Sequence, residues 1–147
     1  MDAFVLGNGE NVAQHVPEPQ YKQLADGSNS LGEGWKVPPI PAEVFSTNSD
    51  DSDWVNRQCT VHPRECFEQR IKLTGGTEKV RNITFILALG FRENTPFPPF
   101  YETAKAKGWK TLTVPCGHEV MLDRPEELTK ILLDASYETS VAAGATQ

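Results

Sequence analysis

The sequence predicts an α/β domain in which parallel strands alternate with helices. Residues 83–89 (ITFILAL) form a continuous apolar run, which is typical of a strand buried on both faces of a parallel sheet. A helix is expected from Pro98 to Lys107, with Gly108 as its C-terminal cap. Lys110–Val114 alternates polar and apolar residues and is expected to be a second strand. A strand, a helix and a strand in this order form a right-handed parallel βαβ unit.

A second helix is expected after that strand, and a histidine lies in the loop between them. Asp123 is expected to cap this helix, with Pro125 in its first turn and Glu126 completing a capping box. The loop PCGH places His118 at the carboxyl end of the strand, the edge of an open α/β sheet where ligands bind. An imidazole can take and return a proton near neutral pH. His118 is therefore a candidate acid–base residue, and a loop histidine bonded to a nearby carbonyl is the alternative.

Composition narrows the class of protein. The 147 residues are enough for one domain, and their net charge of -6 comes without a basic patch, so nucleic acid is not an expected partner. No apolar run approaches the ~20 residues of a membrane span, and no signal segment opens the chain. Three cysteines without disulfide-framework spacing fit a reducing compartment, so a cytoplasmic location is expected.

The first half of the chain contains less regular patterns. The opening MDAFVL is expected to be a short strand that contains Asp2, an acid that is costly inside an apolar strand unless it has a partner. Residues 17–41 are rich in proline and glycine and are expected to form a long loop. Two short helices are expected within residues 48–69, the first capped by Asn48 or Ser49 and the second starting at Pro63.

Cysteine and histidine residues in this region raise the alternative of a metal site. Cys59, His62 and Cys66 have a Cys-x2-His-x3-Cys spacing, and Cys116 could be a fourth zinc ligand. Closed zinc sites usually have paired knuckles, and the chain has no second pair. We therefore expect no metal, and two buried cysteines with a surface histidine are the simpler interpretation.

Two blocks of the sequence resemble a known family. The stretch from ITFILALGF to GHEVMLDRPEELTKILL resembles the last two strands and helices of the α/β-hydrolase fold, most closely the cofactor-independent branch that includes plant methyl esterases and hydroxynitrile lyases. The opening MDAFVLGNGENVA is similar to that branch's LDAFxPxxGxS segment at the end of the sixth strand, and residues 35–39 and 54–67 match its cap.

This resemblance implies a partial α/β-hydrolase fold with the last three parallel strands, flanking helices and a helical cap. Residues 1–135 are then expected to be the carboxyl-terminal half of the domain, with a cap-like segment at about 17–75. Residues 136–147 are expected to be a flexible tail.

The resemblance also assigns roles to individual residues. His118 is expected to be the histidine of a catalytic triad. Its acid is either Asp2, after the sixth strand, or Glu93, after the seventh, and Asp2 is preferred because a strand end holds a carboxylate more rigidly. The apolar side chains of Trp35, Phe45 and Trp54 are expected to contact a small-molecule ester substrate, although they could equally be core residues. No cofactor is implied.

The nucleophile of this fold does not occur in the 147 residues. It normally lies on a G-x-S-x-G elbow between a strand and a helix, a motif that the sequence lacks, and we expect it upstream of Met1 together with the oxyanion-hole donors. The complete parent is expected to cleave a carboxylic ester with a serine nucleophile, and this chain alone to be inactive and to self-associate through an open sheet edge. The alternatives are a non-catalytic binding protein, a metal-binding module, or lyase chemistry on the same scaffold.

Overall fold

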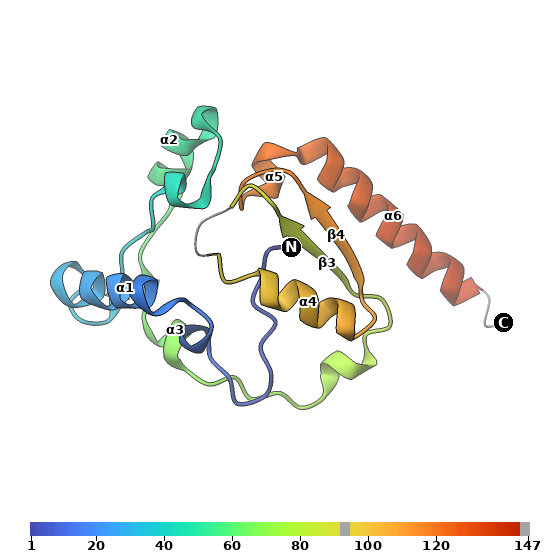
Figure 1. The fold of residues 1–147 in the computed structure, drawn as a ribbon, viewed down its shortest axis with the longest axis horizontal. Helices are drawn as coiled ribbons and strands as arrows, with labels where there is room; N and C mark the ends of the chain where they lie inside the picture. The colour runs from blue at the N-terminus through green and yellow to red at the C-terminus, as the bar shows by residue number, and fades with distance from the viewer. Residues whose placement is uncertain (92–94, 145–147) are drawn as a thin grey trace.

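The computed structural model describes residues 1–91 and 95–144, with side chains up to residue 137. Figure 1 shows a small parallel sheet between two helices, with the helices of residues 18–68 grouped to one side of it. The helices and strands are α1 (Glu18–Leu31), β1 (Lys36–Val37), α2 (Ser49–Gln58), β2 (His62–Pro63), α3 (Glu65–Glu68), β3 (Thr84–Ala88), α4 (Pro98–Ala106), β4 (Lys110–Val114), α5 (Val120–Asp123) and α6 (Pro125–Gly144). Short 3₁₀ helices span Val12–Gln14, Ala42–Phe45 and Gly76–Lys79.

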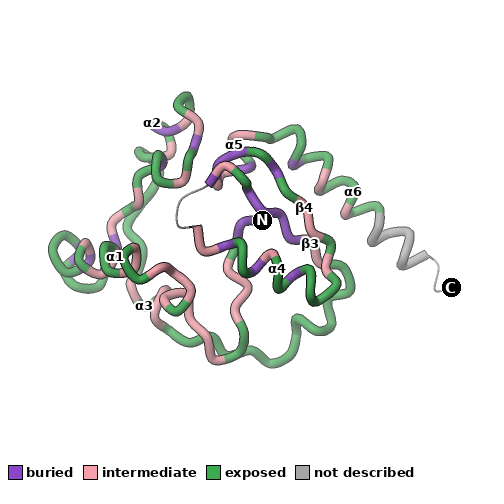
Figure 2. The backbone as a smooth tube through the Cα atoms, viewed as in Figure 1, coloured by how far each residue is buried: buried purple, intermediate pink, exposed green. Residues whose placement is uncertain are grey.

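β3 and β4 pair in parallel, from Thr84 opposite Lys110 to Ala88 opposite Val114. Alternate residues of β3 pack on opposite sides, with Phe85 and Leu87 in the cluster that contains α4 residues and Ile86 and Ala88 in the cluster that contains Leu128 of α6. The predicted strand buried on both faces is therefore confirmed. Figure 2 shows that buried positions follow this strand and the loops at its end.

The helices around this sheet mostly follow the predicted pattern. α4 ends as predicted, because Gly108 has a positive φ of 72° and its N–H donates to the carbonyl of Lys105. The predicted capping box is wrong, because Asp123 is the last residue of α5, and α6 begins at Pro125. α6 also continues to Gly144, past the end predicted at residue 135.

The first residues do not form the predicted third strand. The Asp2 N–H donates to the Ile86 carbonyl over 2.6 Å, so the segment lies beside β3. Asp2 has a φ of 37°, however, which interrupts the extended backbone that a regular ladder needs. The segment instead contributes Phe4, Val5 and Leu6 to the cluster on the α4 side.

The cap segment, residues 17–75, contains a helix where a loop was predicted. Pro17 precedes α1 and Pro19 lies in its first turn, where proline is compatible with a helix. Gly27 lies inside α1, and a Cβ there would be 3.5 Å from Pro38, so the helix packs on the proline-rich segment that follows β1. The prolines and glycine that suggested a loop are thus accommodated by the helix and its packing.

The second part of the cap segment agrees better with the sequence. Asn48 caps α2 as predicted, with its Oδ1 accepting from the N–H of Asp51 over 2.9 Å. α3 begins at Glu65 rather than at Pro63, because Pro63 pairs with Lys36 in the short β1–β2 sheet. Within the described ranges 1–91 and 95–144, no helix has both the length and the apolar character needed to cross a membrane.

Candidate active site

Asp2 and His118 lie in contact although 116 residues separate them in the chain. The imidazole Nδ1 is 3.0 Å from the Asp2 Oδ2, and the Asp2 side chain is 0% exposed whereas that of His118 is 23% exposed. The N–H of Ala88, at the end of β3, donates to the other carboxylate oxygen over 3.0 Å. The carboxyl end of β3 therefore fixes the buried carboxylate that holds the histidine.

The histidine loop, residues 115–119, packs tightly against the cap segment. The His118 N–H donates to the Phe45 carbonyl over 2.9 Å. A Cβ on Gly117 would lie 2.1 Å from the Ser46 carbonyl oxygen, so this approach requires glycine. The loop and residues 45–46 of the cap segment are thus in direct backbone contact.

Aromatic rings fix the plane of the imidazole. Phe97 stacks on His118 with ring centres 5.2 Å apart and an angle of 4°, and Phe45 stacks with centres also 5.2 Å apart and an angle of 30°. Phe91 packs at 5.5 Å with a tilted ring. These contacts leave the imidazole little freedom to rotate away from Asp2.

The hydrogen bond to Asp2 decides what the histidine can do chemically. A carboxylate can only accept, so Nδ1 must carry the hydrogen. Nε2 of a neutral His118 is then the nitrogen with a free lone pair, and His118 lines a pocket. A buried carboxylate on one nitrogen and an available lone pair on the other is the arrangement of a general base.

The pocket next to His118 is large and apolar, with a volume of about 530 Å³. The lining residues in the described part of the chain include no Asp, Glu, Lys or Arg, although 23% of the sequence is charged. The lining residues are Phe4, Val16, Gln20, Gln23, Leu24, Gly27, Leu31, Val37, Pro38, Pro39, Ile40, Pro41, Val44, Phe45, Phe67, Phe91, Pro96, Phe97 and His118. Such a lining favours an uncharged apolar ligand.

Of the three predicted substrate residues, Phe45 lies in this pocket and the two tryptophans do not. Trp35 is 53% exposed and lines a different hollow, and the Lys36 ammonium lies 4.8 Å from its ring centre. Trp54 is 50% exposed on α2. Neither tryptophan lines this pocket, because it faces α1 and the turns around it, where the sequence predicted no helix.

Several pocket residues were missed by the sequence reasoning. Phe91 and Phe97 flank the loop that follows β3, and their position beside a predicted strand end was a usable signal. Leu24 was missed because α1 was not predicted. Glu93, the alternative acid, lies outside the described residues.

The three cysteines lie in different environments, one buried and two exposed. Burial, together with the nearby Asp123 carboxylate, raises the pKa of the Cys116 thiol to about 11, so the reactive thiolate is scarce at neutral pH. Cys59 and Cys66 are exposed, contrary to the expectation that they are buried. No three His, Cys, Asp or Glu side chains within residues 1–91 and 95–137 form a cluster that could hold a metal ion.

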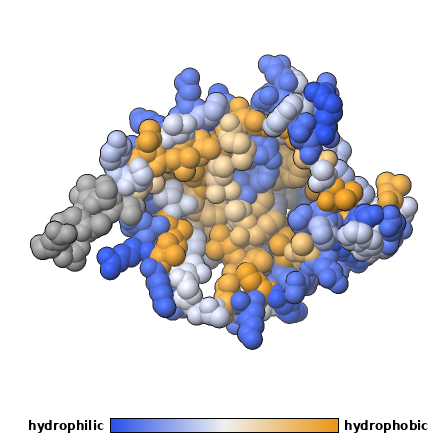
Figure 3. All heavy atoms as spheres, turned by 180° about the vertical axis from the view of Figure 1, so that it is seen from behind, coloured by the Kyte–Doolittle hydropathy of each residue, from blue (hydrophilic) through white to orange (hydrophobic). Residues whose placement is uncertain are grey.

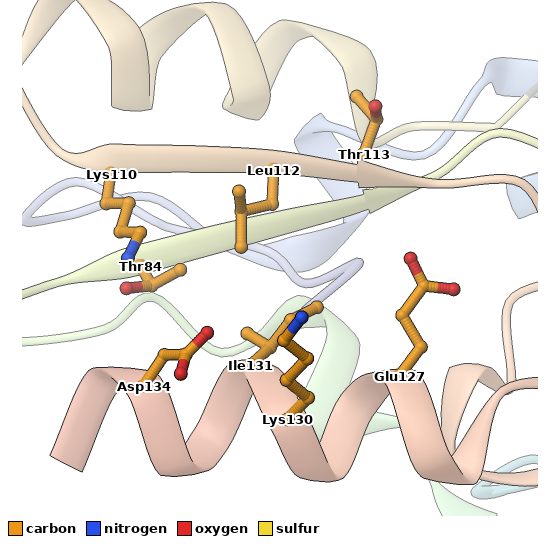
Figure 4. Close-up of a pocket in the computed structure, with 8 residues that line it drawn as sticks. All are labelled: Thr84, Lys110, Leu112, Thr113, Glu127, Lys130, Ile131 and Asp134. Carbon is orange, nitrogen blue, oxygen red and sulfur yellow. The ribbon is translucent and has the colours of Figure 1, made fainter. Parts of the chain in front are cut away.

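A further hollow, of about 310 Å³, lies between β4 and α6. Figure 4 shows its polar side chains reaching from both elements, with Lys110 on the strand and Glu127, Lys130 and Asp134 on the helix. Both signs of charge line it, and none of the residues around His118 takes part. It is a surface groove apart from the candidate active site.

Comparison with known proteins shows that the chain is similar to an esterase. That relative is a carbendazim hydrolyzing esterase from Nocardioides sp. (strain SG-4G), 34% identical over 140 residues. The match covers 90% of this chain and 57% of the relative, so the chain spans little more than half of the relative's length. No protein-family model and no solved structure matches the chain.

Proposed function

We propose that this chain carries the acid–base pair and much of the substrate pocket of a carboxylic-ester hydrolase with the α/β-hydrolase fold. The observation that carries the proposal is the hydrogen bond between buried Asp2 and His118 at the wall of an apolar pocket. The similarity to an esterase supports the reaction class.

His118 moves protons in both halves of the proposed reaction. Its Nε2 takes the proton of a serine hydroxyl while the serine oxygen attacks the carbonyl carbon of the ester. The tetrahedral intermediate then expels the alcohol, which takes that proton from Nε2. Water, deprotonated by the same nitrogen, hydrolyses the acyl-enzyme and restores the serine. Asp2 stabilises the imidazolium that forms in each half, and no cofactor is needed for these steps.

We propose that the serine and its oxyanion-hole donors belong to a part of the complete protein outside these 147 residues. The sequence has no G-x-S-x-G elbow, and the esterase relative extends well beyond the match. The chain alone is then inactive, since loss of the nucleophile lowers kcat on the order of a millionfold.

The remainder of the sheet would continue beside residues 1–6, on the side away from β3. The backbone contact between Asp2 and Ile86 supports this direction. Figure 3 shows apolar side chains gathered across the middle of one face of the molecule, and without a covering layer we expect such a surface to self-associate.

The substrate we propose is an uncharged ester with an apolar or aromatic group. A charged group in a pocket without a charged partner would lose its hydration without compensation. The relative's name states that it hydrolyses carbendazim, which supports a small organic substrate.

The test uses the protein expressed at its native length and a neutral p-nitrophenyl ester. We expect hydrolysis that falls about 10⁴-fold or more in His118→Ala, whereas His62→Ala, an exposed histidine on β2, leaves the rate unchanged. The 147-residue chain alone should give no turnover. Turnover by the short chain, or activity that survives His118→Ala, contradicts the proposal. Binding of the ester by the native-length protein without hydrolysis would favour a binding protein instead.

A further inference from the structure

The Asp123 carboxylate joins two segments that are far apart in the sequence. Its Oδ2 accepts from the Gly117 N–H over 2.8 Å, next to His118. Its Oδ1 accepts from Nδ2 of Asn48 over 2.8 Å and from the Asn48 N–H over 3.3 Å. One side chain therefore connects the histidine loop with the start of α2 in the cap segment.

The two segments also touch directly, so the hydrogen bonds of Asp123 add to an existing contact. The Phe45 carbonyl accepts from the His118 N–H, and the Phe45 ring stacks on the imidazole. The Ser46 carbonyl oxygen packs against Gly117 so closely that no Cβ fits there. If residues 45–48 moved, the backbone and the ring of His118 would lose contacts together.

A carboxylate suits this position better than any neutral side chain. Each of its two oxygens faces a different segment, and both can only accept. Hydrogen bonds to a charged acceptor are roughly twice as strong as neutral ones. The negative charge also lies near the N-terminal end of α2, where the helix dipole favours it.

We propose that Asp123 is a positioning residue that latches the cap segment onto the histidine loop and so holds His118 against Asp2. Its effect on catalysis depends on the proposed ester hydrolysis, whereas its effect on the loop does not. Asp123 thereby couples the cap segment to the general base. A movement of residues 45–48 away from the histidine loop weakens the contacts that hold His118 in place.

The first test measures amide hydrogen exchange at Gly117 in the native-length protein. Asn48→Ser removes the Nδ2 donor but keeps a side chain that can cap α2, and it leaves the acceptor of the Gly117 N–H in place. Asp123→Asn leaves only one acceptor oxygen for two segments. We expect each variant to speed exchange at Gly117 about 10-fold or more, and the double variant to add little to either change. Asp53→Asn, an exposed acid on α2, is the charge-matched control and should have no effect.

A second measurement distinguishes positioning of His118 from simple stabilisation of the cap. The nitrogen NMR signals of the His118 imidazole report its hydrogen bond to Asp2, and we expect them to shift in both Asn48→Ser and Asp123→Asn. Unchanged imidazole signals, or exchange at Gly117 that does not respond to Asn48→Ser, would overturn the latch.

The last measurement is the rate of ester hydrolysis by the native-length protein. We expect Asp123→Asn to lower kcat by about 10- to 100-fold, because small displacements of a catalytic group are costly, with a smaller change in KM. If kcat is unchanged while Gly117 exchange rises, the positioning role is wrong and the hydrolase proposal stands. If the native-length protein hydrolyses no ester, the hydrolase proposal fails. The exchange and NMR data alone then show whether Asp123 holds the cap segment on the histidine loop.

Discussion

Replacing Asp2 tests the buried carboxylate on which the candidate active site depends. The Asp2 side chain is fully buried and accepts two hydrogen bonds, from the Ala88 N–H and from Nδ1 of His118. In Asp2→Ala the Ala88 N–H stays buried without a partner, which costs about 1–3 kcal/mol. The lost bond to the partly exposed His118 adds about 1 kcal/mol after allowance for solvent. We expect the free energy of unfolding to fall by about 2–4 kcal/mol.

Asp2→Asn separates stability from chemistry at the same position. The amide keeps an oxygen for the Ala88 N–H but turns an NH₂ group toward His118, which forces Nδ1 to accept and moves the hydrogen to Nε2. We expect a stability loss of only about 1 kcal/mol. The hydrolysis rate of the native-length protein should nevertheless fall by about 10⁴-fold, because the histidine is then in the wrong tautomer.

The assay is urea unfolding of the native-length protein followed by tryptophan fluorescence, with nitrogen NMR of His118 for the tautomer. Asp53→Ala, on the exposed surface of α2, controls for the loss of one negative charge. An Asp2→Ala variant as stable as the control, or a His118 that keeps its hydrogen on Nδ1 in Asp2→Asn, would refute the role assigned to Asp2.

Three further predictions concern the loop, a thiol and the pocket. Gly117→Ala should lower the free energy of unfolding by about 3 kcal/mol or more, because its Cβ would lie 2.1 Å from a backbone oxygen, whereas Gly76→Ala, with open space around it, should change little in the same urea assay. The pKa of Cys116 is about 11 in the folded state and 9.0 in an unperturbed thiol, so its contribution to stability is complete below pH 9 and is lost between pH 9 and 11; Cys116→Ala should remove that part of the pH dependence of unfolding. Leu24→Asp places a charge in the apolar pocket and should weaken binding of a neutral aromatic fluorophore about 10-fold in a fluorescence titration; unchanged affinity would place the binding site elsewhere.

Local sequence patterns predicted the two strands of the parallel sheet and the end of α4. The apolar run of β3, the alternation in β4 and the glycine after α4 each depend on neighbouring residues, and all three are confirmed. α1 was missed because proline and glycine usually interrupt a helix, and only its packing on Pro38 shows that Gly27 is tolerated.

The candidate site needed more than local patterns. The pairing of Asp2 with His118 links positions 116 residues apart, and it was reached through a resemblance to a family rather than from spacing. The sequence also does not show which aromatic side chains pack against the histidine. Phe45 and Phe97 stack on the imidazole, whereas Trp35 and Trp54 are exposed. Hydrophobicity alone cannot separate these two groups, because the approach of the cap segment to the histidine loop determines which rings are covered.

The measurement that tests the central claim most directly is intact-mass analysis of the native-length protein after reaction with a fluorophosphonate, a reagent that modifies activated serines. We predict one adduct per molecule, on a serine outside these 147 residues, and no adduct in His118→Ala. A protein that forms no adduct, or one whose labelling does not depend on His118, would contradict the assignment of Asp2 and His118 as the acid–base pair of a serine hydrolase.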